Sequence, residues 1–165
     1  MDLNTEMIGP MIRQNPFLVV TYLVKLSNYP IFDTYLRGFL DCEISLNFME
    51  VVSKVMKTVK VPQEFVYDFT ETIIVKLLDM GEENKDKQKL ARVVVNFIKN
   101  FKKTKQLDLD EIEDILKRFL DEFIGVEEVQ QFRKLMVKEW GEAVLGLMFK
   151  FCWMFRHCSR LDIII

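Results

Sequence analysis

The chain has 165 residues, of which half are hydrophobic and 29% are charged. This length and composition fit one domain with a sizeable core and exclude an intrinsically disordered protein. The formal net charge of −2 provides no overall attraction to a phosphate backbone, so nucleic-acid binding would require a local basic patch.

Helix signals run through the first half of the chain. Asn15 places a capping side chain ahead of Pro16 at a first helical position, and Pro30 opens another helix. Ser45 can cap a helix that carries an apolar face from Met49 onward. After Pro62, apolar residues recur every fourth position. We predict helices over residues 4–13, 16–27, 31–41, 45–59 and 62–80.

Helical periodicity is plainest in the second half. The apolar residues that start at Leu90 and at Ile112 repeat at the same helical offsets, so each set forms one stripe that must be buried. Asp108 and Glu111 have the spacing of a capping box, and Gly125 follows the second stripe, where a left-handed residue would end the helix. We predict helices over residues 86–103, 108–124 and 126–138.

These elements predict an all-α fold, an array of about eight antiparallel helices in one compact domain, because no segment alternates like a half-buried strand. We assign this domain to residues 1–138. The residues expected in its core include Val51, Val52, Phe65, Val94 and Phe119. Phenylalanines at helical spacing are also expected there rather than in a base-stacking platform, namely Phe39, Phe48, Phe69 and Phe97.

Residues 139–165 form a divergent apolar tail that we expect to be helical. Its apolar run from Ala143 to Phe155 is interrupted by Lys150 and is too short to span a bilayer. Three interpretations stay open: a helix that packs on the domain, an interfacial or partner-binding segment, or an aberrant end of the gene model.

The sequence offers no group of residues typical of catalysis. His157 is the only histidine, so no general base is evident for a nucleophile. Cys42, Cys152 and Cys158 match neither a closed zinc motif nor an even disulfide framework. The acidic run from Asp108 to Asp114 suits a helix start. We predict no enzymatic activity, no cofactor, no metal and no small-molecule substrate.

An ordered set of motifs resembles the C-terminal domain of subunit eleven of the CCR–NOT mRNA deadenylase complex. The similarity covers roughly residues 8 to 137, and the motifs are Asn15-Pro16-Phe17-Leu18-Val19, Ser45-Leu46, Met49-Glu50-Val51-Val52, Val61-Pro62, Glu64-Phe65-Val66 and Lys89-Leu90-Ala91-Arg92. The family's amino-terminal anchoring region has no counterpart here, so we expect the recruiting part of the subunit.

The resemblance implies a non-enzymatic module that recruits protein partners for mRNA deadenylation, decay and translational repression. Its partners would be other CCR–NOT subunits and adaptor proteins, in the cytoplasm and the nucleus, without a membrane. We expect a hydrophobic groove that holds a partner's helix or short linear motif.

Candidate partner-binding residues are polar or aromatic side chains beside the predicted core stripes. Tyrosines suit interfaces because one end is apolar and the other forms hydrogen bonds. Glu50 lies in a family motif, and arginines suit bidentate contacts with a partner, although internal salt bridges would explain these residues equally well. The candidates are Tyr22, Tyr35, Glu50, Tyr67, Arg92 and Arg133.

The alternative function is an RNA-binding helical array. It would use the lysine-rich 99–105 segment, which contains Lys99, Lys102, Lys103 and Lys105. This alternative predicts strongly salt-dependent binding to unstructured RNA.

Overall fold

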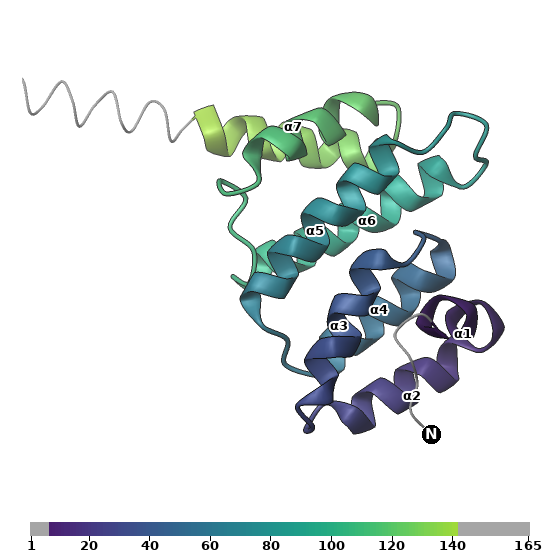
Figure 1. The fold of residues 1–165 in the computed structure, drawn as a ribbon. Helices are drawn as coiled ribbons and strands as arrows, with labels where there is room; N and C mark the ends of the chain where they lie inside the picture. The colour runs from purple at the N-terminus through teal and green to yellow at the C-terminus, as the bar shows by residue number, and fades with distance from the viewer. Residues whose placement is uncertain (1–6, 142–165) are drawn as a thin grey trace, which may run out of the picture.

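The structure is a computed structural model that describes residues 7–141, and over this range it contains eight helices and no strand (Figure 1). The predicted all-α fold is confirmed. The helices are α1 (Ile8–Gln14), α2 (Pro16–Leu26), α3 (Ile31–Asp41), α4 (Leu46–Thr58), α5 (Gln63–Leu78), α6 (Lys87–Lys103), α7 (Glu113–Glu122) and a last helix over residues 127–141.

The helices stack in two rows. α2 packs on α4 and α4 on α6, while α3 packs on α5 and α5 on α7. α1 packs against α2, α3 and α4 at one end of the stack, and the 127–141 helix lies beside α7 at the other end (Figure 1). Each amphipathic stripe is therefore buried against helices that are close in the sequence.

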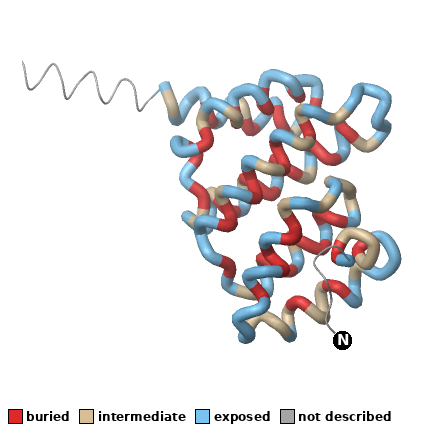
Figure 2. The backbone as a smooth tube through the Cα atoms, in the orientation of Figure 1, coloured by how far each residue is buried: buried red, intermediate tan, exposed pale blue. Residues whose placement is uncertain are grey.

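A chain of phenylalanine rings joins the middle helices. Phe69 of α5 is fully buried, and its ring centroid lies 6.0 Å from that of Phe48 in α4 and 5.4 Å from that of Phe97 in α6. Figure 2 shows the buried positions along the facing sides of the helices, with exposed positions on turns and outer sides. The predicted core residues are all buried: Phe39, Phe48, Val51, Val52, Phe65, Phe69, Val94, Phe97 and Phe119.

Two predicted helix caps are confirmed. The side chain of Asn15 accepts a hydrogen bond of 3.0 Å from the backbone N–H of Leu18, with Pro16 at the first position of α2. The hydroxyl of Ser45 accepts a bond of 3.2 Å from the backbone N–H of Phe48. Each cap satisfies one of the N–H groups that a helix start leaves without an internal partner.

The predicted start of α7 at residue 108 is wrong, because the helix begins at Glu113. The Asp108 carboxylate accepts a bond of 3.2 Å from the N–H of Asp110, which forms a turn instead of a capping box. Leu107 and Leu109 are both buried, so their two-residue spacing requires an extended segment there. Burial of these leucines outweighs the local capping signal.

Gly125 does not adopt the left-handed conformation predicted for it at the end of α7. A left-handed residue does follow α6, at Lys105. No described glycine has a positive φ, whereas Lys105 has a φ of 58°. The N–H of Gln106 donates to the carbonyl of Phe101 and that of Lys105 to the carbonyl of Lys102, each at 3.0 Å. This pattern is a Schellman motif that ends α6 with a lysine where glycine is usual.

The last helix runs beyond the predicted boundary at residue 138, as far as residue 141. Trp140 packs against the core, with the Lys117 ammonium 5.4 Å from its ring centroid. Predictions for residues 4–6 and 142–165, including the apolar run to Phe155 and His157, lie outside the described residues. Among the described helices, none is both long enough and apolar enough to cross a membrane.

Candidate functional site

Two of the predicted tyrosines lie together between α2 and α3. The rings of Tyr22 and Tyr35 meet edge to face, with their centroids 6.1 Å apart. Tyr35 is only 2% exposed, so its side chain lies in the core and not on the expected surface, and its role in partner binding stays a prediction. Tyr22 is half-buried.

The three charged candidates form ion pairs within the domain. Glu50 pairs with Lys54 at 2.7 Å, and Arg92 pairs with Glu128 at 2.8 Å. The third, Arg133, pairs with Asp121 at 2.9 Å. Exposed pairs of this kind contribute little to stability. The structure does not bring the charged candidates together, and their role in partner binding stays a prediction.

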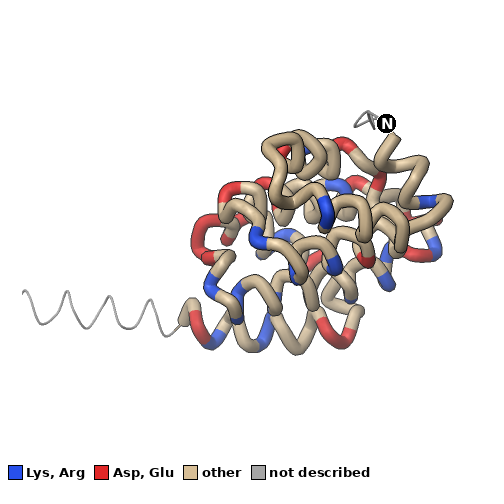
Figure 3. Tube along the Cα trace, turned by 90° about the horizontal axis from the view of Figure 1, so that it is seen from below, with Lys and Arg blue, Asp and Glu red and all other residues tan. Residues whose placement is uncertain are grey.

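The lysine-rich segment after residue 98 is partly used inside the fold. Lys99 donates to the carbonyl of Glu128 at 3.3 Å and lies 5.6 Å from the ring centroid of Phe132. Lys102 donates to both carboxylate oxygens of Glu139, at 2.6 and 2.7 Å. These contacts hold the last helix on α6. Figure 3 shows basic and acidic positions interspersed along the chain.

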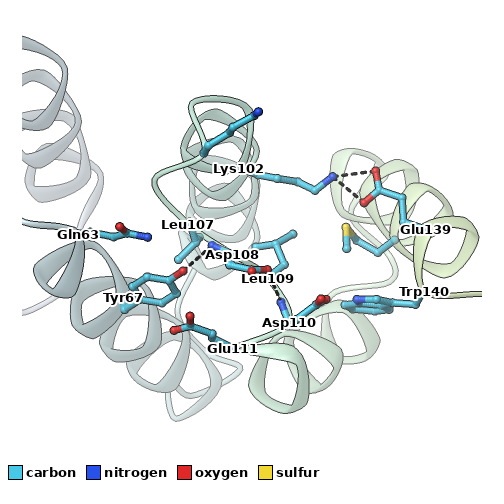
Figure 4. A pocket seen from close by; sticks show the side chains of 12 residues that line it. Gln63, Tyr67, Lys102, Leu107, Asp108, Leu109, Asp110, Glu111, Glu139 and Trp140 are labelled. Atoms are coloured by element: carbon cyan, nitrogen blue, oxygen red, sulfur yellow. Dashed lines mark hydrogen bonds and ion pairs between the residues drawn. The ribbon is translucent and has the colours of Figure 1, made fainter. Parts of the chain in front are cut away.

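One hollow of about 550 Å³ lies between α5, the loop before α7 and the last helix (Figure 4). Tyr67 lines it, and its hydroxyl accepts a hydrogen bond of 2.7 Å from the backbone N–H of Asp108. Lys102 and Glu139 close another side through their ion pair. The Tyr67 hydroxyl and the Lys102 ammonium are therefore already engaged in bonds that hold the domain together.

A second hollow is a groove of about 590 Å³ between the C-terminal halves of α4 and α6, hereafter the α4–α6 groove. Its apolar part consists of Met56, Val59, Val93, Phe97 and Phe101. Polar residues line the rest, namely Ser53, Lys57, Thr58, Lys60, Asn96, Asn100, Thr104 and Gln106. An apolar base with a few polar groups is the usual form of a recognition groove.

The groove carries positive charge and no negative side chain. Lys57 and Lys60 line it and are exposed, and neither forms an ion pair with a described residue. The carboxamides of Asn96 and Asn100 also line it, and among the described residues they have no hydrogen-bond partner. These groups are free to bind another molecule.

The sequence led us to expect a hydrophobic groove but did not indicate its position. The signal available was the four-residue spacing of Asn96, Asn100 and Thr104, which places three small polar side chains in one line along a helix. They lie beside the apolar stripe that contains Phe97 and Phe101, so the edge of the stripe marks the groove wall.

Within the described residues, no three His, Cys, Asp or Glu side chains gather into a group that could hold a metal ion. Cys42 is half-buried, and its thiol donates to the carbonyl of Gly38 at 3.3 Å. Burial raises the pKa of Cys42 above its ordinary value, so the reactive thiolate is disfavoured.

A comparison with protein families matches residues 12–137 to the family described as CCR4-NOT transcription complex subunit 11. The matched range begins in α1 and ends within the last helix, so it contains both walls of the α4–α6 groove.

Proposed function

Because the chain belongs to the family of CCR4-NOT transcription complex subunit 11, we propose that it is a non-enzymatic module that recruits proteins to that complex. The recruited proteins are adaptors or other subunits, and the outcome is deadenylation, decay and translational repression of mRNA. The module works in the cytoplasm and the nucleus.

The observation that carries this proposal is the α4–α6 groove. Its apolar base is continuous with the domain core through Phe97, which contacts the Phe69 ring. A groove built on two packed helices keeps its shape without a ligand, and this limits the entropy lost on binding. The unpaired lysines and carboxamides at its edge supply directional contacts.

The absence of catalysis is part of the proposal. Catalysis by side chains needs a base within reach of a nucleophile or of the substrate proton. The α4–α6 groove presents lysines, amides and hydroxyls but no acid and no histidine. Such a set is suited to binding and lacks the imidazole and carboxylate groups that most often serve as general bases.

Affinity capture with paired variants tests the proposal. Asn100 lines the groove and is exposed, so Asn100→Trp fills the groove without removing a core contact. Arg118 is exposed on α7, and Arg118→Trp is the matched control. We expect CCR4-NOT subunits or adaptors to co-purify with the wild type and Arg118→Trp and to be lost with Asn100→Trp. Equal capture by all three would contradict the assignment to this groove.

The RNA alternative is weakened because two of its four lysines form contacts within the domain. Of its four lysines, Lys99 and Lys102 bind Glu128 and Glu139 in the last helix, which leaves Lys103 and Lys105. Titration with unstructured RNA at two salt concentrations checks this point. We expect no measurable affinity even at low salt, whereas a steep dependence of affinity on salt would support RNA binding.

A further inference from the structure

The chemistry of the α4–α6 groove also indicates what occupies it. We propose that the groove binds an extended linear segment of another protein, with apolar side chains on the groove base and an acidic residue at the end where α4 stops. This inference rests on the proposed function and adds the conformation and charge of the bound segment.

The spacing of two asparagines supports the extended conformation. Asn96 and Asn100 are four residues apart on α6, so their Cα atoms are separated by about 6 Å along the helix axis. Alternate residues of a strand are separated by about 6.6 Å. A carboxamide offers both a donor and an acceptor. The two side chains can therefore each pair with the backbone N–H and C=O of alternate residues in an extended segment.

A bound helix would not use these carboxamides in this way. Its backbone groups are already satisfied internally, except at its ends. An extended segment has no such internal bonds and needs partners when it leaves water. Because Asn96 and Asn100 are unpaired among the described residues, the wall of the groove provides those partners.

Charge complementarity supports an acidic residue in the segment. Lys57 lies in the last turn of α4, and Lys60 lies just beyond its end. The partial negative charge of a helix C-terminus is about half a unit, so the two ammonium groups leave this end of the groove positive. No acidic side chain lines the groove to offset them.

The tail of this same chain is a poorer occupant by the same reasoning. Residues 142–165 carry three basic side chains and two acidic ones, so their net charge is positive; they are Lys150, Arg156 and Arg160 against Glu142 and Asp162. These positive charges would meet Lys57 and Lys60 and be repelled. The electrostatics therefore favour a separate protein with an acidic segment.

The test begins with a displayed library of random peptides, each of roughly ten residues and so about 33 Å when extended. The library is selected on the full chain and counter-selected on Asn100→Trp. Binding of the recovered peptides is then measured by fluorescence polarisation. We expect sequences with alternating apolar residues and at least one acidic residue.

Variants of the domain test each contact. We expect Asn96→Ala or Asn100→Ala to weaken peptide binding by about tenfold each, because each removes two hydrogen bonds to the peptide backbone. We expect Lys57→Glu with Lys60→Glu to weaken binding by more than tenfold and to reverse its salt dependence, because the new carboxylates repel the acidic residue and salt screens that repulsion. The control is Lys103→Glu, an exposed lysine outside the groove, which should leave affinity unchanged.

Modified peptides test the conformation. N-methylation at every second residue should weaken binding by about tenfold in one register and leave it unchanged in the other, since alternate N–H groups of a strand point the same way.

Peptides that require Asn100 but have apolar residues at helical spacing would overturn the extended conformation and leave the proposed function standing. Failure to recover any peptide sensitive to Asn100→Trp would remove both. Tighter binding after deletion of residues 142–165, by more than tenfold, would show that the tail occupies the groove.

Discussion

Phe69 holds α4, α5 and α6 together, so its removal is a direct test of how the domain is stabilised. Its side chain is completely buried, and its ring lies 6.0, 5.7 and 5.4 Å from those of Phe48, Phe65 and Phe97. Phe69→Ala deletes this ring from a position where three neighbouring helices converge. The neighbours are themselves large and fixed in helices, so the space can close only in part.

Three contributions set the expected magnitude. Burial of a phenylalanine side chain is worth about 2–3 kcal/mol, and a favourable ring pair adds about 0.5–1.5 kcal/mol. A residual cavity adds further cost, so the free energy of unfolding should fall by about 4 kcal/mol. With a urea dependence of about 2 kcal/mol per molar, the unfolding midpoint should fall by about 2 M.

Urea unfolding followed by circular dichroism measures this change. The matched control is Phe17→Ala, because Phe17 is 75% exposed and should alter the free energy by less than about 0.5 kcal/mol. Phe69→Leu should fall between the two. A loss below about 1 kcal/mol for Phe69→Ala, or an equal loss at Phe17, would refute the assignment of Phe69 to the centre of the core.

Three further predictions concern helix ends and acid stability. Lys105→Gly should stabilise the domain by about 0.5–1 kcal/mol in the same assay, because glycine adopts the left-handed conformation without strain. The control is Lys103→Gly, which lies inside the last turn of α6 and should destabilise the domain. Ser45→Ala should cost about 1 kcal/mol through loss of the α4 cap, and Ser45→Asp should retain stability. A hydrogen bond from its own backbone N–H, with Arg92 nearby, lowers the pKa of Glu128 below its usual 4.5, so its contribution is present above that pH and is lost below it. Glu128→Gln should therefore be less stable than the wild type at neutral pH. In urea titrations at several pH values, the difference in unfolding free energy between the two proteins should shrink as the pH falls below 4.5. A difference that does not change with pH would contradict this.

Helices whose apolar stripe and cap agree could be predicted from the sequence. The predicted ranges 16–27 and 45–59 agree with α2 and α4 to within one residue at either end. The agreement is close because Asn15 and Ser45 provide local caps and the apolar stripes specify the buried face. In these segments local preference and tertiary packing favour the same structure.

The errors arose where packing outweighs a local signal. The capping-box spacing at Asp108 suggested a helix start, but Leu107 and Leu109 reach the core only from an extended chain. Likewise, Tyr35 lies beside a predicted stripe and is nevertheless buried against Tyr22, because α2 packs on α3. Both outcomes depend on contacts between helices that no single segment contains.

The α4–α6 groove could not be predicted from either of its helices alone. It exists because Met56 and Phe97 line one hollow from two helices that are separated in the sequence by α5. What could be predicted was the outer position of Asn96 and Asn100, one turn apart on α6. The distance between α4 and α6 depends on the stacking of the rows and on the ring of Phe69, which packs against Phe48 of α4 and Phe97 of α6.

The two-row stack has a consequence for how the chain reaches its native state. Each numbered helix packs mainly on helices one or two places away in the chain, so forming the core requires few long loop closures. Proteins with such local connectivity have low contact order and refold quickly, often within milliseconds. A nascent chain of this kind can bury each helix pair soon after its synthesis, and its apolar stripes are then exposed only briefly to other proteins.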